Sequence, residues 1–149
     1  MAYVSVQTDD FDLNAEVACI RAGNQDIGAV VSFIGTVRDI DGSLRSMTLE
    51  HYPGMTEQEL ERIANEAEKR WPLIGCRIIH RFGTLKPADN IVLVITASRH
   101  RSAAFEAADF LMDFLKSNAP FWKKETTAGK EQWVEAKAAD EQALERWNS

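Results

Sequence analysis

The run IVLVITAS at residues 91–98 constrains the fold more than any other stretch of the sequence. Apolar and β-branched residues follow one another there without polar alternation, which is typical of a strand that has neighbours on both sides in a sheet. Another apolar strand is predicted at residues 76–85, and the stretch KPADN between the two is rich in turn-forming residues. We therefore expect an antiparallel hairpin whose second strand lies in the middle of a sheet.

Further elements are expected on both sides of this hairpin. Additional strands are predicted at residues 28–37, 46–51, 121–126 and 131–136. The last two are expected to pair as a hairpin around Ala128 and Gly129. A polar helix is predicted to end the chain, at residues 139–147.

Two amphipathic helices are predicted from apolar residues that recur at helical spacing. Thr56 and Glu59 are interpreted as a capping box at the start of the first, which should end by Trp71 because Pro72 follows. The second is expected at about 102–117, with Ser102 as its N-cap.

Length and composition place the chain among globular proteins. We expect one domain over residues 1–149, because this length buries a sufficient core without disulfides or metals. The apolar runs are too short for a membrane span, and the first residues lack the pattern of a secretory signal. A cytoplasmic protein without membrane contact is predicted. The net charge of -6 disfavours nucleic acid as a partner.

Cysteine and histidine usage argues against a metal centre. Cys19 and Cys76 form no CxxC pair, so a zinc ribbon and a dithiol redox site are not expected, and both thiols are interpreted as small buried residues. The three histidines lack the spacing of metal ligands, and His51 and His80 are interpreted as packing or interface residues. No metal site and no cofactor are predicted.

Positive charge gathers at three places where predicted elements end. These cations are Arg38, His100, Arg101, Lys116, Lys123 and Lys124. The backbone N–H groups of a helix N-terminus next to His100 and Arg101 favour a phosphate. Lys116 and Lys123 flank the aromatic pair of KSNAPFWKKE, and an amine desolvated by aromatic walls has a lowered pKa that suits proton transfer. An anion-binding enzyme is one hypothesis.

Each cluster also has a structural interpretation that the residues alone leave open. Arg38 can simply pair with Asp39 or Asp41. His100 and Arg101 can be a solvated connector between two elements. Lys116 can interact with the dipole at a helix C-terminus, and Phe121 and Trp122 can be core or interface residues.

Several motifs together resemble the catalytic (large) subunit of molybdopterin synthase. They are GTVR at 35–38, LEHYPGM at 49–55, RWP at 70–72, HRFG at 80–83, HRSAAFEA at 100–107 and LKSNAPFWKKE at 115–125. The resemblance implies an α+β fold with an α/β hammerhead portion and an antiparallel β subdomain. It also implies a homodimer of large subunits within a heterotetramer.

The resemblance further implies a reaction and a partner. The family converts cyclic pyranopterin monophosphate to molybdopterin by inserting two dithiolene sulfurs. The sulfur comes from the C-terminal thiocarboxylate of a small ubiquitin-like sulfur-carrier subunit, whose tail enters the pocket of the large subunit. Neither cysteine of this chain needs to carry sulfur in such a reaction.

The family's functional residues fall on matching positions of this sequence. Lys116 would act as general acid and base, and Lys123 would hold the substrate or the tail carboxylate. The remaining substrate-binding positions are Arg38, His100 and Arg101, with Thr36, Val37, Lys124 and Glu125 in the adjoining wall. Asp39-Ile40-Asp41 departs from the Asn-containing loop often found in relatives, which bears on the conformation of that loop and on partner contacts.

Two other functions compete with this one. The chain could be a non-catalytic adaptor that docks a ubiquitin-like protein through Phe121 and Trp122. It could also be an enzyme for a different phosphorylated metabolite.

Overall fold

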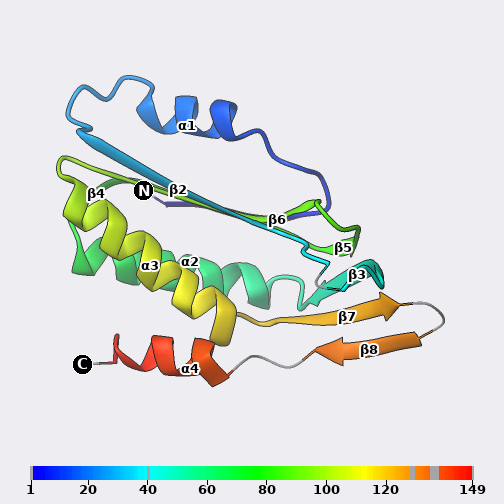
Figure 1. Cartoon of the computed structure of the whole chain (residues 1–149). Coiled ribbons are helices and arrows are strands. Elements are labelled where there is room, and N and C mark those ends of the chain that lie inside the picture. Colours follow the sequence, from blue (N-terminus) through cyan, green and yellow to red (C-terminus); the bar gives the residue numbers. More distant parts are fainter. Residues whose placement is uncertain (1, 40, 128–129, 135–137, 149) are drawn as a thin grey trace.

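The computed structural model of the chain describes residues 2–39, 41–127, 130–134 and 138–148. Along these residues the elements follow in the order β1 (Ala2–Gln7), α1 (Leu13–Arg21), β2 (Ala29–Thr36), β3 (Leu44–His51), α2 (Met55–Arg70), β4 (Leu73–Arg81), β5 (Gly83–Leu85), β6 (Asn90–Ser98), α3 (Arg101–Ser117), β7 (Phe121–Thr127), β8 (Lys130–Val134) and α4 (Ala138–Glu145). Figure 1 shows their arrangement.

The strands form two separate sheets. The first has the order β1-β4-β6-β2, in which β1 runs parallel to β4 and the other pairs are antiparallel. The second has the order β5-β3-β7-β8 and is antiparallel throughout. A mixed sheet with helices and a separate antiparallel sheet confirm the predicted α+β class with an antiparallel β subdomain.

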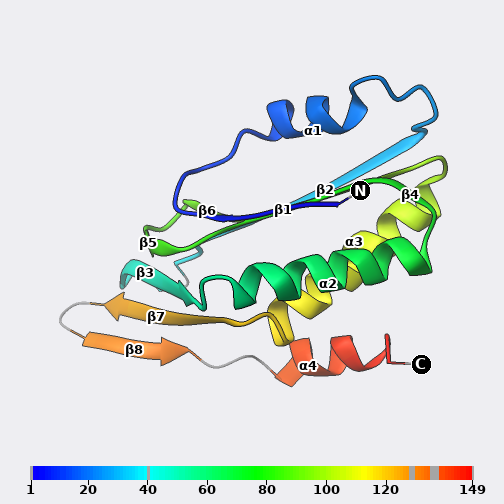
Figure 2. The same cartoon turned by 180° about the vertical axis from the view of Figure 1, so that it is seen from behind.

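Helices cover both faces of the first sheet, which explains the uninterrupted apolar run of β6. Helix α1 lies on one face, and α2 and α3 lie on the other (Figures 1 and 2). Side chains alternate along a strand, so Val92 and Val94 pack beneath α2 and α3, while Leu93 and Ile95 pack beneath α1. The prediction of an antiparallel hairpin with a central second strand is confirmed, with Ile78 opposite Val94.

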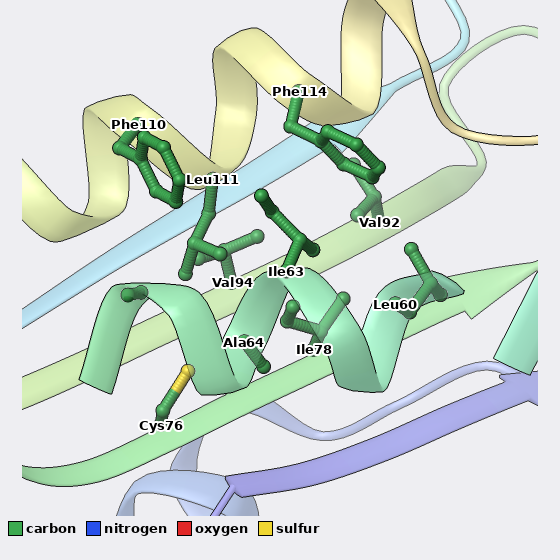
Figure 3. Close-up of a cluster of buried hydrophobic side chains, with 11 residues drawn as sticks. Leu60, Ile63, Ala64, Cys76, Ile78, Val92, Val94, Phe110, Leu111 and Phe114 are labelled. Carbon is green, nitrogen blue, oxygen red and sulfur yellow. The ribbon is translucent and has the colours of Figure 1, made fainter. Parts of the chain in front are cut away.

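The larger core lies between this sheet and the helix pair. Leu60 and Ile63 from α2 meet Phe110, Leu111 and Phe114 from α3 above the strands, as Figure 3 shows. The apolar positions that predicted both helices are therefore the ones that face the sheet. Their burial fixes the direction of α3 and with it the position of the residues at its C-terminal end.

One predicted strand is in fact two strands in different sheets. The range 76–85 was expected as a single strand, but β4 ends at Arg81 and β5 begins at Gly83. Gly83 has a φ of 95°, a left-handed conformation that glycine adopts without steric cost. The chain turns there and leaves the first sheet for the second.

The predicted helix starts are wrong, although the helices themselves are confirmed. Helix α2 begins after Gly54, whose N–H donates to Glu57 Oε2 at 3.3 Å. Thr56 is fully buried, and its hydroxyl accepts from Tyr52 N and donates to Pro120 O, both at 3.0 Å. Glu59 pairs with Arg62 instead of capping the helix.

Helix α3 likewise begins one residue earlier than predicted. Its N-cap is His100, so Ser102 is not the cap. The end of α2 before Trp71 and the end of α3 at Ser117 agree with the prediction.

Near the N-terminus the structure contains elements that were not predicted. Strand β1 pairs with β4, and Asp12 caps α1 by accepting a hydrogen bond from Ala15 N at 3.1 Å. Cys19 lies exposed on α1, so its predicted burial is wrong, whereas Cys76 is buried as expected. The predicted turn residues Ala128 and Gly129 lie outside the described residues, but β7 and β8 pair as predicted. Helix α4 lies within one residue of its predicted start.

Candidate active site

A pocket of about 330 Å³ lies where the C-terminal end of α3 meets both sheets. Helix α3 contributes Lys116 and Ser117, β7 contributes Phe121 and Lys123, and β4 contributes His80. The pocket thus combines two cations and a histidine with apolar walls.

Lys116 and Lys123 reach this pocket because the chain stops being helical between them. The N–H groups of Asn118 and Ala119 both donate to Phe114 O, at 2.8 and 3.1 Å, and β7 starts at Phe121 after Pro120. Both lysines line the same pocket, on the two sides of the turn. Lys116 remains exposed to solvent, so the desolvation expected for it is not present. Its position in the last turn of α3 is favourable for a cation.

Lys124 lies apart from these two lysines. Lys123 lines the pocket, whereas Lys124 does not. The Lys124 ammonium lies 3.5 Å from Glu131 Oε2 and 5.5 Å from the centre of the Trp133 ring. Glu125, the next residue of β7, is half-buried opposite Met47 and Gln132 and does not line the pocket.

At the end of β2 and just after it, Gly35 lines the pocket and the next residues do not. Gly35 is part of the wall, whereas Thr36 and Arg38 are exposed and Val37 is buried with Met47. Asp39 Oδ1 accepts a hydrogen bond from Gly42 N, and Asp41 Oδ1 accepts one from Ser43 N. The predicted pairing of Arg38 with either carboxylate is absent from the described residues.

His100 and Arg101 are exposed at the opposite end of α3 from Lys116. A helix rises 1.5 Å per residue, so roughly 22 Å separates Arg101 from Lys116 along the axis. A single chain therefore does not bring these two predicted binding residues to the pocket.

Comparisons with known proteins show the family to which the chain belongs. The family model described as MoaE protein matches residues 6–118. The molybdopterin synthase catalytic subunit of Mesorhizobium japonicum is 58% identical over 148 residues, which cover 98% of this chain and 93% of that protein. The chain belongs to the MoaE family of molybdopterin synthase catalytic subunits.

Solved structures extend this match to the fold of the MoaE family. The molybdopterin biosynthesis MoaE protein from Burkholderia ambifaria has a TM-score of 0.86 and 55% identity, and the alignment covers 100% of this chain and 99% of that one. A complex of subunits 1 and 2 of the molybdopterin-converting factor from Helicobacter pylori gives a TM-score of 0.72 at 20% identity, covering 89% and 90% of the two chains.

Membership of the MoaE family confirms the resemblance seen in the sequence motifs. It makes the chain an enzyme of molybdenum cofactor biosynthesis, and the adaptor alternative is not supported. Within the described residues, no group of three or more acidic, histidine or cysteine side chains is placed to hold a metal ion. No helix in that part of the chain is long and apolar enough to cross a membrane.

His80 is the pocket residue whose importance the sequence did not reveal. Its ring stacks on Phe121 with centroids 3.7 Å apart, and Nδ1 lies 2.8 Å from Arg81 O. Burial lowers the pKa of His80 to about 4, and the charges of Lys116 and Lys123 act in the same direction. The imidazole is therefore neutral at pH 7. The one available signal was its place on the same strand face as the core residues Cys76 and Ile78.

Ser117 is the second such residue. Its hydroxyl is buried at the pocket and has no hydrogen-bond partner among the described residues. In the sequence it was only the last residue of a predicted helix, and nothing in the pattern distinguishes a helical serine that faces solvent from one that faces a pocket.

Proposed function

We propose that the chain inserts two sulfur atoms into cyclic pyranopterin monophosphate, using the C-terminal thiocarboxylate of a small ubiquitin-like subunit as the sulfur donor. The observation that carries this proposal is the convergence of Lys116 and Lys123 on one pocket of an otherwise acidic chain. Both the substrate phosphate and a thiocarboxylate are anions. Two ammonium groups in one pocket attract them and hold them close together.

The two lysines have different tasks in this proposal. Each sulfur insertion forms a bond between a substrate carbon and the donor sulfur and breaks a carbon–oxygen bond of the substrate, whose oxygen leaves more easily once it is protonated. Water then hydrolyses the bond between that sulfur and the acyl carbon of the donor tail, which becomes a carboxylate. Lys116, exposed in the last turn of α3, delivers and removes protons as general acid and base. Lys123 extends from a strand and holds the substrate phosphate or the tail carboxylate as a fixed positive charge.

The remaining cations require a second copy of the chain. His100 and Arg101 lie too far along α3 to reach the pocket of their own chain. In the homodimer that the resemblance implies, these residues of one copy bind the substrate held by Lys116 of the other. The exposed apolar residues Phe33 and Ile34 on β2 and Phe105 on α3 provide a surface for such a contact.

Arg38, Thr36, Val37, Lys124 and Glu125 keep the roles implied by the resemblance in this assembly. Arg38 is exposed and without an ion pair among the described residues, so its planar guanidinium is available for two phosphate oxygens. The others form the surroundings of the site. The complex of two subunits from H. pylori supports a small-subunit partner. The proposal includes the cytoplasmic location predicted from the sequence.

The experiment that tests this function is product formation by the Lys116→Ala variant. The purified chain is mixed with a thiocarboxylated small subunit and cyclic pyranopterin monophosphate, and dithiolene product is measured. General acid–base catalysis contributes about 100-fold to 10,000-fold in rate, so we expect a loss of at least about 100-fold. Circular dichroism and binding of the small subunit should not change.

Lys69→Ala is the matched control for this variant. Lys69 is also an exposed lysine in the last turn of a helix, α2, and it does not line the pocket. It should retain wild-type turnover. Wild-type turnover by Lys116→Ala would refute the proposed role of Lys116, and absence of product from the wild-type mixture would refute the function itself.

A further inference from the structure

Two neutral polar side chains in the pocket have no task in the chemistry assigned to the lysines. Ser117 Oγ is buried and has no hydrogen-bond partner in the part of the chain that the structure describes, although a serine in a helix can bond to the carbonyl one turn earlier. A buried hydroxyl without a partner destabilises the folded state. An unpaired hydroxyl at a pocket indicates a ligand that forms a hydrogen bond with it.

His80 presents a second unused hydrogen-bonding atom. A carbonyl oxygen only accepts, so the 2.8 Å contact to Arg81 O requires the proton of the neutral ring to be on Nδ1. Nε2 then carries a lone pair and is an acceptor. The stacked Phe121 ring, with an interplanar angle of 16°, holds the imidazole in this orientation.

Burial first, and then the groups around His80, lower the pKa of the ring and keep it neutral. Lys116 faces it from α3, Lys123 from β7 and His51 from β3, and all three oppose protonation of the ring. The pocket therefore holds a fixed neutral acceptor beside two cations. A ligand with only negative charge makes no use of such an acceptor, whereas a ligand that also carries N–H or O–H donors does.

We propose that Ser117 and His80 form a neutral hydrogen-bonding subsite that binds the pterin ring of the substrate, while Lys116 and Lys123 bind its charged groups. This subsite rests on the proposed function. A pterin ring carries N–H donors and carbonyl or ring-nitrogen acceptors along its edges. His80 Nε2 accepts from a ring N–H, and the Ser117 hydroxyl donates to a ring acceptor or accepts from a ring donor.

The subsite also provides selectivity between ligands. An apolar wall binds flat rings of many kinds, but a buried hydroxyl and a fixed imidazole acceptor reject a ring that leaves them unpaired. The lysines alone accept any small phosphate. Ser117 and His80 therefore distinguish the pterin phosphate from other phosphorylated metabolites.

The test compares binding of the pterin ring with binding of the charged groups of the substrate. Turnover by the complex with the thiocarboxylated small subunit gives KM and kcat for cyclic pyranopterin monophosphate, and inhibition by inorganic phosphate reports on the charged groups alone. We expect Ser117→Ala to raise KM about tenfold, as for loss of one hydrogen bond, with unchanged phosphate inhibition. The variant should unfold at the same or a higher temperature, because an unpaired buried hydroxyl is removed.

His80 is tested with a pair of amide variants. His80→Asn retains a donor for Arg81 O but has no acceptor at the position of Nε2, so KM should rise about tenfold. His80→Gln extends an amide oxygen toward that position and should restore part of the loss. Ser32→Ala, at an exposed serine on β2, is the control and should match the wild type in KM and in melting temperature.

The outcomes separate this proposal from the proposed function. If the wild type turns over and Ser117→Ala and His80→Asn have its KM, the subsite does not exist while the function stands. If inhibition by phosphate weakens while KM rises, Ser117 and His80 contribute to binding of the charged groups and the proposal is wrong. Absence of turnover by the wild type overturns the function and the subsite together.

Discussion

The pKa of His80 predicts how the stability of the fold depends on pH. Burial is the main cause of its decrease from the ordinary value of 6.5 to about 4, and Lys116, Lys123 and His51 add to it. At pH values between these two, His80 binds a proton in the unfolded chain but not in the folded chain. The free energy of unfolding therefore falls as the pH falls from about 6.5 to about 4, and it is unaffected by His80 above that window.

The magnitude follows from the two pKa values. In the pH range where the histidine is protonated only in the unfolded chain, the free energy of unfolding falls by about 1.4 kcal/mol for each unit by which the pH falls. At pH 5 the loss attributable to His80 is therefore about 2 kcal/mol relative to pH 7, and at pH 4 it is about 3 kcal/mol. For a domain whose total stability is about 5–15 kcal/mol, this is a large fraction.

The assay is urea denaturation of the wild type and of His80→Asn at pH 7 and pH 5. One fixed protein concentration is used throughout, because the stability of an oligomer depends on it. The Asn variant retains a donor for Arg81 O but does not titrate. For each protein the change in the free energy of unfolding between pH 7 and pH 5 is calculated first, which removes any constant effect of the substitution. The changes in the two proteins are then compared, which removes the contribution of groups that titrate in both.

We expect the wild type to lose about 2 kcal/mol more than His80→Asn between pH 7 and pH 5. An equal loss in the two proteins would refute the reasoning, because it would mean that the buried histidine accepts a proton as readily in the folded chain as in the unfolded one. A larger loss in the variant would have the same meaning.

Two further predictions concern the scaffold that positions the pocket, and urea denaturation measures both. Leu111 is fully buried between α3 and the sheet, so Leu111→Ala should lower the free energy of unfolding by about 2–5 kcal/mol. Glu61→Ala, at an exposed position of α2, should change it by less than about 0.5 kcal/mol. Similar effects of the two substitutions would contradict the assigned core. A Cβ at Gly28 would lie 2.1 Å from the backbone oxygen of Arg99, whereas one at Gly75 would lie 2.8 Å from a methyl group of Ile20. Gly28→Ala should therefore be the more destabilising, since a side chain moves aside more easily than backbone, and the reverse order would show that the close approach at Gly28 is wrong.

Most elements with a strong local pattern could be predicted from the sequence. The uninterrupted run of β6 indicated a central strand, and the helical spacing of apolar residues located α2 and α3. These signals are local, because periodicity and apolar content are properties of neighbouring residues. The expected cationic site at Lys116 and Lys123 was also based on local evidence, a helix end followed by Pro120.

The elements that were missed or misplaced depend on distant partners. Strand β1 is held by parallel pairing with β4 across about half the chain, which no window of neighbouring residues shows. The division of 76–85 into β4 and β5 depends on which sheet each part joins, and Gly83 permits the change of direction. The predicted caps failed because Gly54 and His100 occupy those positions, while Thr56 bonds to Pro120, which is distant in sequence.

The sequence by itself determined the kinds of chemistry available to this protein: lysines around a helix end, an acidic chain that confines any anion site to one place, and motifs that resemble one enzyme family. The tertiary structure decided which of these groups act together. It brings Lys116 and Lys123 to one pocket, directs Lys124 to Glu131 and leaves His100 and Arg101 at the far end of α3. It also makes His80 neutral, because burial and the field of charges from three separate elements act on one ring only after the chain has folded.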